Sequence, residues 1–161
     1  MQKREIQIKA TEFETLEELP EQDRQLIISA RQASGKAYAP YSGFLVGAAV
    51  LLNNGDIIKG NNQENADFTD GLCAERVALF YAQASYPDLP VVALAVSAVN
   101  TKGVLTALAQ PCGSCRQVMV ETESRFKQPI RIILDGKDKI MVFESAECLL
   151  PLAFKPTVLN K

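Results

Sequence analysis

The chain is 161 residues long and 47% hydrophobic, which predicts a single domain around one buried core. Its 17 basic and 19 acidic residues leave a net charge of -2 without a block rich in lysine or arginine, so nucleic acid is not an expected partner. The absence of histidine excludes Ser/His and Cys/His catalytic pairs and every His-ligated metal site, so a general base must be a carboxylate, a lysine, a tyrosine or metal-bound water.

The N-terminal segment is polar and precedes the main pattern of the chain. It has no apolar stretch that could serve as a signal peptide, and no later run is long enough to span a bilayer, so we expect a cytoplasmic protein with no membrane partner. Residues 4–9 alternate polar side chains with Ile6 and Ile8, which is the period of a half-buried strand. We interpret residues 1–19 as an extension that contains a strand, and residues 20–161 as the domain itself.

Helical and strand patterns then alternate along the chain. Apolar residues recur at helical spacing from Pro20 to a stop signal at Gly35, which predicts a first helix. Residues 44–52 and 57–60 flank the turn sequence Asn-Asn-Gly-Asp and predict a β-hairpin. Further patterns predict helices over 76–84 and 116–121, strands over 91–99, 130–134 and 140–143, and a last helix over 148–154. This order predicts an α/β fold, a three-layer sandwich with a central mixed five-stranded sheet flanked by helices.

Two cysteine motifs carry the chemistry of the chain, each at the predicted start of a helix. Cys73 begins the sequence Cys-Ala-Glu-Arg, and Cys112 and Cys115 form a Cys-x-x-Cys within Pro-Cys-Gly-Ser-Cys-Arg-Gln. A Cys-x-x-Cys at a helix N-terminus can aim both sulfurs at one point, where the helix dipole favours thiolates. With Cys73 as a third ligand, a tetrahedral Zn²⁺ keeps one position open for water, as in catalytic zinc sites.

Two charged residues that follow Cys73 complete this hypothesis. Glu75 is near enough in sequence to reach water at the metal without being a ligand, which makes it the natural proton carrier in a chain without histidine. Three thiolates on a dication leave a net negative charge, which weakens the metal's ability to acidify water. The guanidinium of Arg76 could offset this charge by donating hydrogen bonds to the thiolates.

The two motifs together resemble the cytidine deaminase family, in its short, all-cysteine, homotetrameric form. The resemblance covers roughly residues 20–156 and includes three further segments, Tyr41-Ser-Gly-Phe-Leu-Val-Gly-Ala-Ala49, Gly60-Asn-Asn-Gln-Glu-Asn-Ala66 and Leu149-Leu-Pro-Leu-Ala-Phe154. It implies a cytidine deaminase-like domain that hydrolyses free cytidine and 2′-deoxycytidine to the uridines and ammonia, in pyrimidine salvage. It also implies one Zn²⁺ per subunit on Cys73, Cys112 and Cys115, with Glu75 as the proton shuttle.

The resemblance extends to the residues that would bind the substrate. Asn62 and Glu64 match a pair that holds the ribose 3′-hydroxyl, and the backbone of Ala74 matches a group that meets the amine of the base. Phe44 matches an aromatic residue of the base pocket. Phe154 matches an aromatic residue that reaches into the active site of a neighbouring subunit, so the resemblance implies a homotetramer with composite active sites and a small nucleoside as partner.

Other interpretations of the same motifs stay open at this point. The Cys-x-x-Cys alone is also typical of a redox pair, and Cys148 could complete a four-cysteine site in a non-catalytic, zinc-stabilised interaction domain, although its apolar surroundings favour an inert buried thiol. A similar deaminase could act on another aminopyrimidine, such as blasticidin S, or on the free base; Asn62 and Glu64 favour a sugar. Arg116 is interpreted as a salt-bridge residue.

Overall fold

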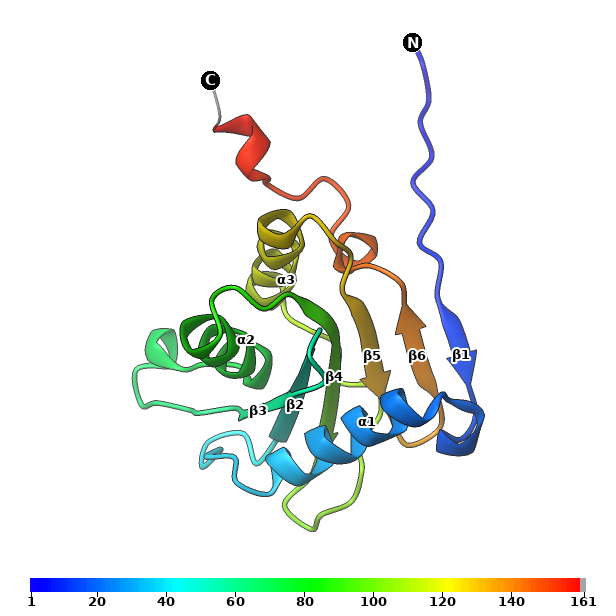
Figure 1. The fold of residues 1–161 in the computed structure, drawn as a ribbon. Helices are drawn as coiled ribbons and strands as arrows, with labels where there is room; N and C mark the ends of the chain where they lie inside the picture. The colour runs from blue at the N-terminus through cyan, green and yellow to red at the C-terminus, as the bar shows by residue number, and fades with distance from the viewer. Residues whose placement is uncertain (160–161) are drawn as a thin grey trace.

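A mixed sheet of six strands, in the order β1-β6-β5-β4-β2-β3, forms the centre of the fold (Figure 1). The computed structural model describes residues 1–159. The strands are β1 (Thr11–Phe13), β2 (Leu45–Leu52), β3 (Ile57–Asn61), β4 (Val91–Val99), β5 (Arg131–Asp135) and β6 (Ile140–Phe143). β4 and β5 run parallel, and the other neighbouring pairs run antiparallel. The predicted α/β sandwich is confirmed, with one strand more than the five expected.

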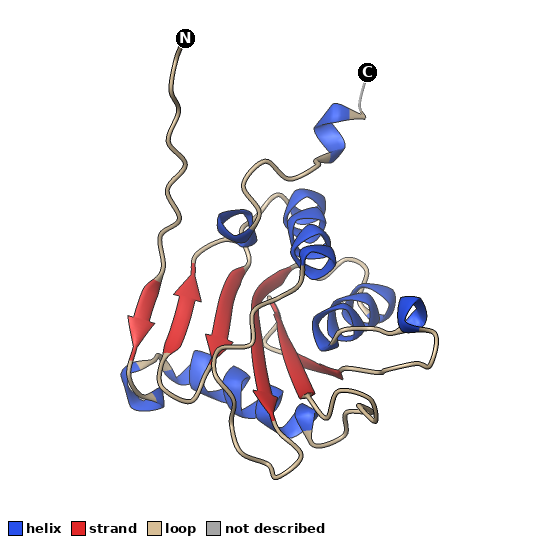
Figure 2. Cartoon of the chain, turned by 180° about the vertical axis from the view of Figure 1, so that it is seen from behind, coloured by secondary structure: helices blue, strands red, loops and turns tan. Residues whose placement is uncertain are grey.

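Helices cover both faces of this sheet. The α-helices are α1 (Glu21–Ser34), α2 (Ala74–Ser85) and α3 (Gly113–Phe126), and the short 3-10 helices are η1 (Leu16–Glu18), η2 (Phe68–Asp70), η3 (Ala146–Leu149) and η4 (Pro156–Val158). α1 lies on one face, and α2 and α3 lie on the opposite face, as the two views of the ribbon show (Figures 1 and 2). Within residues 1–159, no helix is long and apolar enough to cross a membrane.

The continuous apolar run of β2 follows from its place between these layers. Successive side chains of a strand point to opposite faces, so a strand covered on both sides is apolar at every position. Ala49 and Leu51 accordingly belong to the core beneath α1, whereas Ala48 and Val50 belong to the core beneath α2 and α3. The hairpin partner β3 lies at the edge of the sheet, and its central Lys59 is exposed.

Two glycines allow the helices to approach the sheet closely. A Cβ atom at Gly47 in β2 would lie 2.0 Å from the carbonyl oxygen of Ala30 in α1. A Cβ atom at Gly60 in β3 would lie 2.5 Å from the backbone nitrogen of Ala78 in α2. A Cβ atom fits at neither position. Gly47 therefore allows α1 to lie directly against β2, and Gly60 allows the first turns of α2 to lie directly against β3.

The strand predicted at residues 4–9 is wrong. These residues are exposed and form no strand, and the N-terminal strand is instead β1, whose Thr11 pairs with Val142 of β6. The physical reason is the length of β6, which ends at Phe143 before the chain turns into η3. In the antiparallel register of this pair, Phe143 faces Ala10, so residues 4–9 extend past the end of their neighbour.

The last helix, predicted over residues 148–154, is also wrong. The structure has the 3-10 helix η3 there, followed by a turn in which Leu152 adopts a positive φ of 66°. Pro151 accounts for the difference, because a proline lacks the backbone N–H that a helix needs and disfavours helical geometry in the residue before it. Residues 150–155 therefore form turns and irregular chain between η3 and η4.

Candidate metal centre and active site

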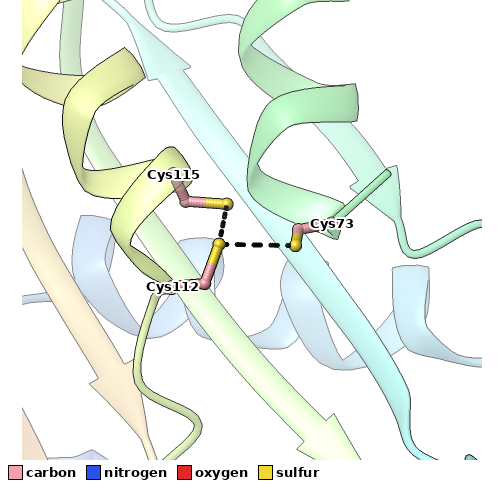
Figure 3. A group of neighbouring side chains, drawn as sticks. All are labelled: Cys73, Cys112 and Cys115. Atoms are coloured by element: carbon pink, nitrogen blue, oxygen red, sulfur yellow. Dashed lines mark hydrogen bonds between the residues drawn. The ribbon is translucent and has the colours of Figure 1, made fainter. Parts of the chain in front are cut away.

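The N-termini of α2 and α3 bring three cysteines together (Figure 3). Cys73 is the N-cap residue of α2, Cys112 is the N-cap residue of α3, and Cys115 lies in the first turn of α3. The Sγ atom of Cys112 is 3.7 Å from that of Cys73 and 3.5 Å from that of Cys115, and all three lie within 4.8 Å of one another. Both helix dipoles thus direct their positive ends at one cluster of sulfurs.

The spacing of these sulfurs fits a single zinc ion. With a Zn–S distance of about 2.3 Å, the corners of a tetrahedron lie roughly 3.8 Å apart. The Sγ–Sγ distances of 3.7 and 3.5 Å given above are close to this value. Among residues 1–159, the group contains no fourth cysteine or carboxylate ligand. Cys148 lies in η3, packed against the core of the α2 and α3 face. The three soft thiolate donors suit zinc, and their number is that of an open site rather than a sealed four-cysteine one.

The cysteines differ in how readily they lose their protons. A hydrogen bond from the Cys115 thiol, together with one from Arg76, lowers the pKa of Cys73 to about 5 in spite of its partial burial. The same contact with Cys73, reinforced by burial, raises the pKa of Cys115. The contact between these two sulfurs thus favours one thiolate and one thiol in the pair, and a metal that bound both sulfurs would displace the proton that they share.

Arg76 lies beside the cysteines, as its place in the sequence motif suggested. Its Nη2 atom donates hydrogen bonds to Sγ of Cys73, at 3.8 Å, and to the carbonyl oxygen of Gly71, at 3.3 Å. The second bond ties the guanidinium to the loop before α2, so its position does not depend on the sulfur alone. This cation is placed to offset the negative charge that three thiolates would leave on a dication.

Glu75 is a buried carboxylate at the wall of a cavity beside the sulfurs. Only 4% of the residue is exposed, and burial raises the pKa of its carboxyl group. Glu75 does not belong to the group of potential ligands, which consists of the three cysteines. Burial thus raises the proton affinity of this carboxyl group above that of an exposed one, which suits a group that must accept a proton and return it.

Most of the site residues predicted from the sequence line the same cavity as the Glu75 carboxylate. Its volume is about 250 Å³, just below the range of about 300–1,000 Å³ usual for drug-sized ligands, so it suits a small substrate. Its lining includes two of the three cysteines and the predicted proton carrier, together with four predicted substrate residues: Cys73, Cys112, Glu75, Phe44, Asn62, Glu64 and Ala74. Cys115 is buried behind this lining and does not contribute to it. The lining also includes Ser42 and Gln110, which the sequence analysis missed. Ser42 stands inside one of the motifs that resemble the family, so a signal for it was present.

The two predicted sugar-binding residues of the cavity, Asn62 and Glu64, are held by the loop that precedes β2. Glu64 accepts hydrogen bonds from the backbone nitrogens of Tyr41 and Ser42 and from the hydroxyl of Ser42. These bonds, that of the hydroxyl first, lower the pKa of Glu64 and keep it ionised. The side chain of Asn62 accepts from the nitrogen of Val46, at 2.8 Å, and donates to the carbonyl oxygen of Phe44, at 2.9 Å. The aromatic ring and the two polar groups thus form one connected wall.

Phe154 lies outside this cavity, and Arg116 makes contacts other than the predicted one. Phe154 does not line the cavity of its own chain: it is 58% exposed, and its carbonyl oxygen accepts a hydrogen bond from Gln117 at 2.7 Å. Arg116 was predicted to form a salt bridge. This prediction is wrong, because within residues 1–159 Arg116 forms no ion pair. Its guanidinium donates to the carbonyl oxygens of Pro111, at 2.8 Å, and Leu149, at 3.0 Å, and so ties the Cys112 loop to the C-terminal segment.

Comparisons with known proteins point to one family. The model of the cytidine and deoxycytidylate deaminase zinc-binding region matches residues 20–128. The cytidine deaminase of Halalkalibacterium halodurans is 50% identical over 100 residues, which are 62% of this chain and 71% of the relative. The cytidine deaminase of Mycobacterium tuberculosis is 40% identical over 106 residues, 64% of this chain and 75% of the relative.

Solved structures agree with these sequence comparisons. The crystal structure of cytidine deaminase from Burkholderia pseudomallei superposes with a TM-score of 0.69 at 41% identity, over 81% of this chain and 97% of that one. The crystal structure of cytidine deaminase from Mycobacterium tuberculosis gives a TM-score of 0.62 at 34% identity, over 81% of this chain and 94% of that one.

Proposed function

Because the chain belongs to the family of zinc-binding cytidine and deoxycytidylate deaminases, we propose that it hydrolyses free cytidine and 2′-deoxycytidine to uridine and 2′-deoxyuridine with release of ammonia. One observation carries the proposal: a cluster of three cysteine sulfurs borders, through Cys73 and Cys112, a cavity that is also lined by a buried carboxylate, an aromatic residue and two polar side chains. The relatives named above are cytidine deaminases, which favours cytidine as a substrate. The reaction would serve pyrimidine salvage.

The cysteines and Glu75 divide the chemistry. Cys73, Cys112 and Cys115 would hold one Zn²⁺ per subunit, which as a Lewis acid lowers the pKa of water in the site. Glu75 takes a proton from the water that attacks C4 of the cytosine ring and delivers it to N3. The Glu75 carboxylate then takes the remaining proton of the hydroxyl group on C4 and passes it to the departing amine, so that the C4–N4 bond breaks, the C4 carbonyl forms and ammonia leaves. The raised pKa of Glu75 supports both steps, because the group must act as base and acid in turn.

Other residues that line the cavity would hold the nucleoside in place for this chemistry. In this proposal Asn62 and Glu64 bind the ribose 3′-hydroxyl, Phe44 packs against the base, and the backbone of Ala74 meets the amine. Glu64 keeps about one lone pair free, on Oε1, beside its three hydrogen bonds from the loop, since a carboxylate can accept about four. A free nucleoside, rather than nucleic acid, suits a cavity of about 250 Å³.

The assembly and location of the protein are parts of the same proposal. The exposed ring of Phe154 would enter the active site of a neighbouring subunit in a homotetramer, completing a composite site. Such an enzyme would act in the cytoplasm, where nucleosides are recovered and thiolate ligands stay reduced.

A substrate series tests the proposed activity. The purified, zinc-loaded protein is given cytidine, 2′-deoxycytidine, 3′-deoxycytidine, free cytosine and blasticidin S, and uridine-type products and ammonia are measured. We expect both natural nucleosides to react, with kcat/KM lower by on the order of a hundredfold for 3′-deoxycytidine and free cytosine, because Asn62 and Glu64 would lose their partner when the substrate covers them. Equal turnover of free cytosine would remove the sugar site from the proposal, and preference for blasticidin S would replace the substrate.

A further inference from the structure

The segment before β1 is an extended chain without a partner. Residues 1–10 are exposed, form neither helix nor strand, and continue directly into β1 at the edge of the sheet (Figures 1 and 2). β6 ends at Phe143, and within residues 1–159 no strand pairs with residues 4–9. Their backbone N–H and C=O groups therefore stand ready to form a ladder with another strand.

The side chains of this segment separate into an apolar face and a charged face. Side chains alternate along an extended chain, so Ile6 and Ile8 share one face, and Glu5, Gln7 and Lys9 share the other. The two isoleucines are 58% and 57% exposed. This is the pattern of a strand that is buried on one side, although more than half of the surface of each isoleucine is exposed in the single chain.

The apolar face has a place to pack against the same molecule. Ile8 and Ala10 line a groove of about 260 Å³ together with Met141, Phe143 and Leu149 of the sheet end and η3. Gln110 and Arg116 also line the groove, and a second strand beside residues 5–9 would add further isoleucines to its apolar part. The groove thus indicates on which side such a ribbon would lie.

We propose that residues 5–9 of two copies of this chain pair as antiparallel strands about a two-fold axis that passes between the two Gln7 residues. In this register Glu5 of one copy lies opposite Lys9 of the other, and Ile6 lies opposite Ile8. The axis repeats both pairings, so the ribbon has two ion pairs on one face and four isoleucines on the other. Opposite charges and β-branched residues across a ladder stabilise it.

Charge complementarity selects both this register and a second copy as the partner. A shift by one residue would place Arg4 opposite Lys9 and Ile6 opposite Gln7, which mixes like charges and divides the apolar face. An isologous contact requires such self-complementarity, which a strand evolved for an unrelated partner would not show. A ribbon of five residues is marginal by itself, so the contact is weak unless the groove beneath Ile8 is filled as well. The inference does not depend on the proposed activity.

Disulfide formation tests the register directly in the full-length, zinc-loaded protein. Residues directly opposite each other in an antiparallel ladder have Cα atoms about 4.5–5.5 Å apart, within the range for a disulfide. Gln7→Cys should therefore form a covalent dimer under mild oxidation. Lys3→Cys is the matched control, because in this register its two copies would lie roughly 27 Å apart along the ribbon. Wild-type protein sets the background from the native cysteines.

Two results would overturn the proposal: equal rates of dimer formation for the two variants, or no dimer above the wild-type background for Gln7→Cys. Charge exchange supplies an independent test by sedimentation. Glu5→Lys alone and Lys9→Glu alone should each weaken the contact between copies by roughly tenfold, since the axis doubles each repulsive pair. The double variant should restore it. If the double variant associates no better than the single ones, the pairing of Glu5 with Lys9 is wrong.

Discussion

Glu75 is the single residue on which the proposed chemistry depends most. Replacing it in Glu75→Gln keeps the size of the side chain and part of its hydrogen bonding but removes its ability to carry a proton. Since Glu75 lies outside the group of three sulfurs, zinc content and fold should be retained, whereas kcat should fall by about 10²–10⁴-fold. Metal analysis and steady-state kinetics on the same preparation check both parts.

Cys112→Ser is the matched control for this prediction, because it removes a thiolate ligand and should lose zinc before it loses its fold. Loss of zinc from Glu75→Gln would instead make Glu75 a ligand. Near-normal turnover with zinc retained would contradict the mechanism, since the chain has no histidine and Glu75 is the only carboxylate within the two cysteine motifs.

Ser42 is a positioning residue that the structure adds to the site. Its hydroxyl donates to Glu64 and accepts from the backbone nitrogen of Phe44, at 3.0 Å, so it connects the proposed sugar contact to the proposed base contact. Ser42→Ala should raise KM for cytidine by roughly fivefold to tenfold, the effect of about one hydrogen bond, with kcat changed less.

Two variants separate this role from a general loss of stability. Ser42→Thr keeps the hydroxyl and should recover most of the affinity. Ser124→Ala removes a hydroxyl that bonds to Val120 within α3, away from the lining of the cavity, and should leave KM unchanged. A fall in kcat with KM unaltered in Ser42→Ala would show that the hydroxyl acts on the chemical step instead.

Among the secondary-structure elements, α1, β4 and β5 are tied together by one buried carboxylate. Asp135 in β5 is 0% exposed and accepts two hydrogen bonds from Arg31 of α1, at 2.7 and 2.8 Å, and one from Ser97 of β4, at 2.7 Å. Donation of these hydrogen bonds to Asp135 is the main cause that raises the pKa of Arg31. Bidentate geometry and burial distinguish this pair from an ordinary surface ion pair.

Asp135→Ala should therefore destabilise the fold by about 2–4 kcal/mol, because it leaves a hydroxyl and a partly buried guanidinium without their acceptor. Urea unfolding followed by circular dichroism measures the change. Glu12→Ala is the control: it breaks the exposed pair with Lys139, at 2.6 Å, and should cost less than about 1 kcal/mol. Equal losses in the two variants would mean that the buried network contributes no more than a surface contact.

The helix ends of the site show a conflict between stability and ligand binding. N-cap positions favour serine, threonine, asparagine and aspartate, which bond to the first backbone N–H groups. α2 and α3 have Cys73 and Cys112 there instead. A sulfur is a poor substitute for a capping oxygen, so these helices exchange some local stability for two thiolates that face each other.

At the scale of the whole molecule, Phe154 connects the proposed activity to the proposed assembly. The ring is exposed in the single chain, and the segment that carries it is held at its backbone by Gln117. Phe154→Ala should raise KM and weaken the oligomer together, because one aromatic ring would serve both contacts. Kinetics and sedimentation measured over the same range of protein concentration check this.

Val104→Ala, which truncates an exposed apolar residue of a loop, is the control for Phe154→Ala and should change neither property. A fully active monomer of the wild-type protein would refute the composite site. A change in the oligomer with KM unaltered would keep the interface but remove the ring from the active site.

Local sequence patterns were sufficient for most of the elements and for the chemical type of the site. Strands β4 and β6 begin and end where their apolar runs do, because a strand buried on both faces is marked at every position. Helices α2 and α3 start earlier than their predicted ranges, because first turns at Ala74 and Gly113 carry no apolar period. The cysteine motifs were recognisable because metal ligation demands particular residues at fixed spacing.

Only the tertiary structure decided which atoms from distant segments meet. The position of β1 depends on where β6 ends, the exclusion of Cys148 from the sulfur cluster depends on how η3 packs, and the bonds of Arg116 and Ser42 reach other loops. Arg31 and Asp135 are 104 residues apart in the chain, yet Arg31 donates two hydrogen bonds to Asp135. The sequence alone determines what each segment can form, because propensity and periodicity are local properties. Which partner a strand end, a thiol or a guanidinium finds is decided by packing, because that depends on the whole chain at once.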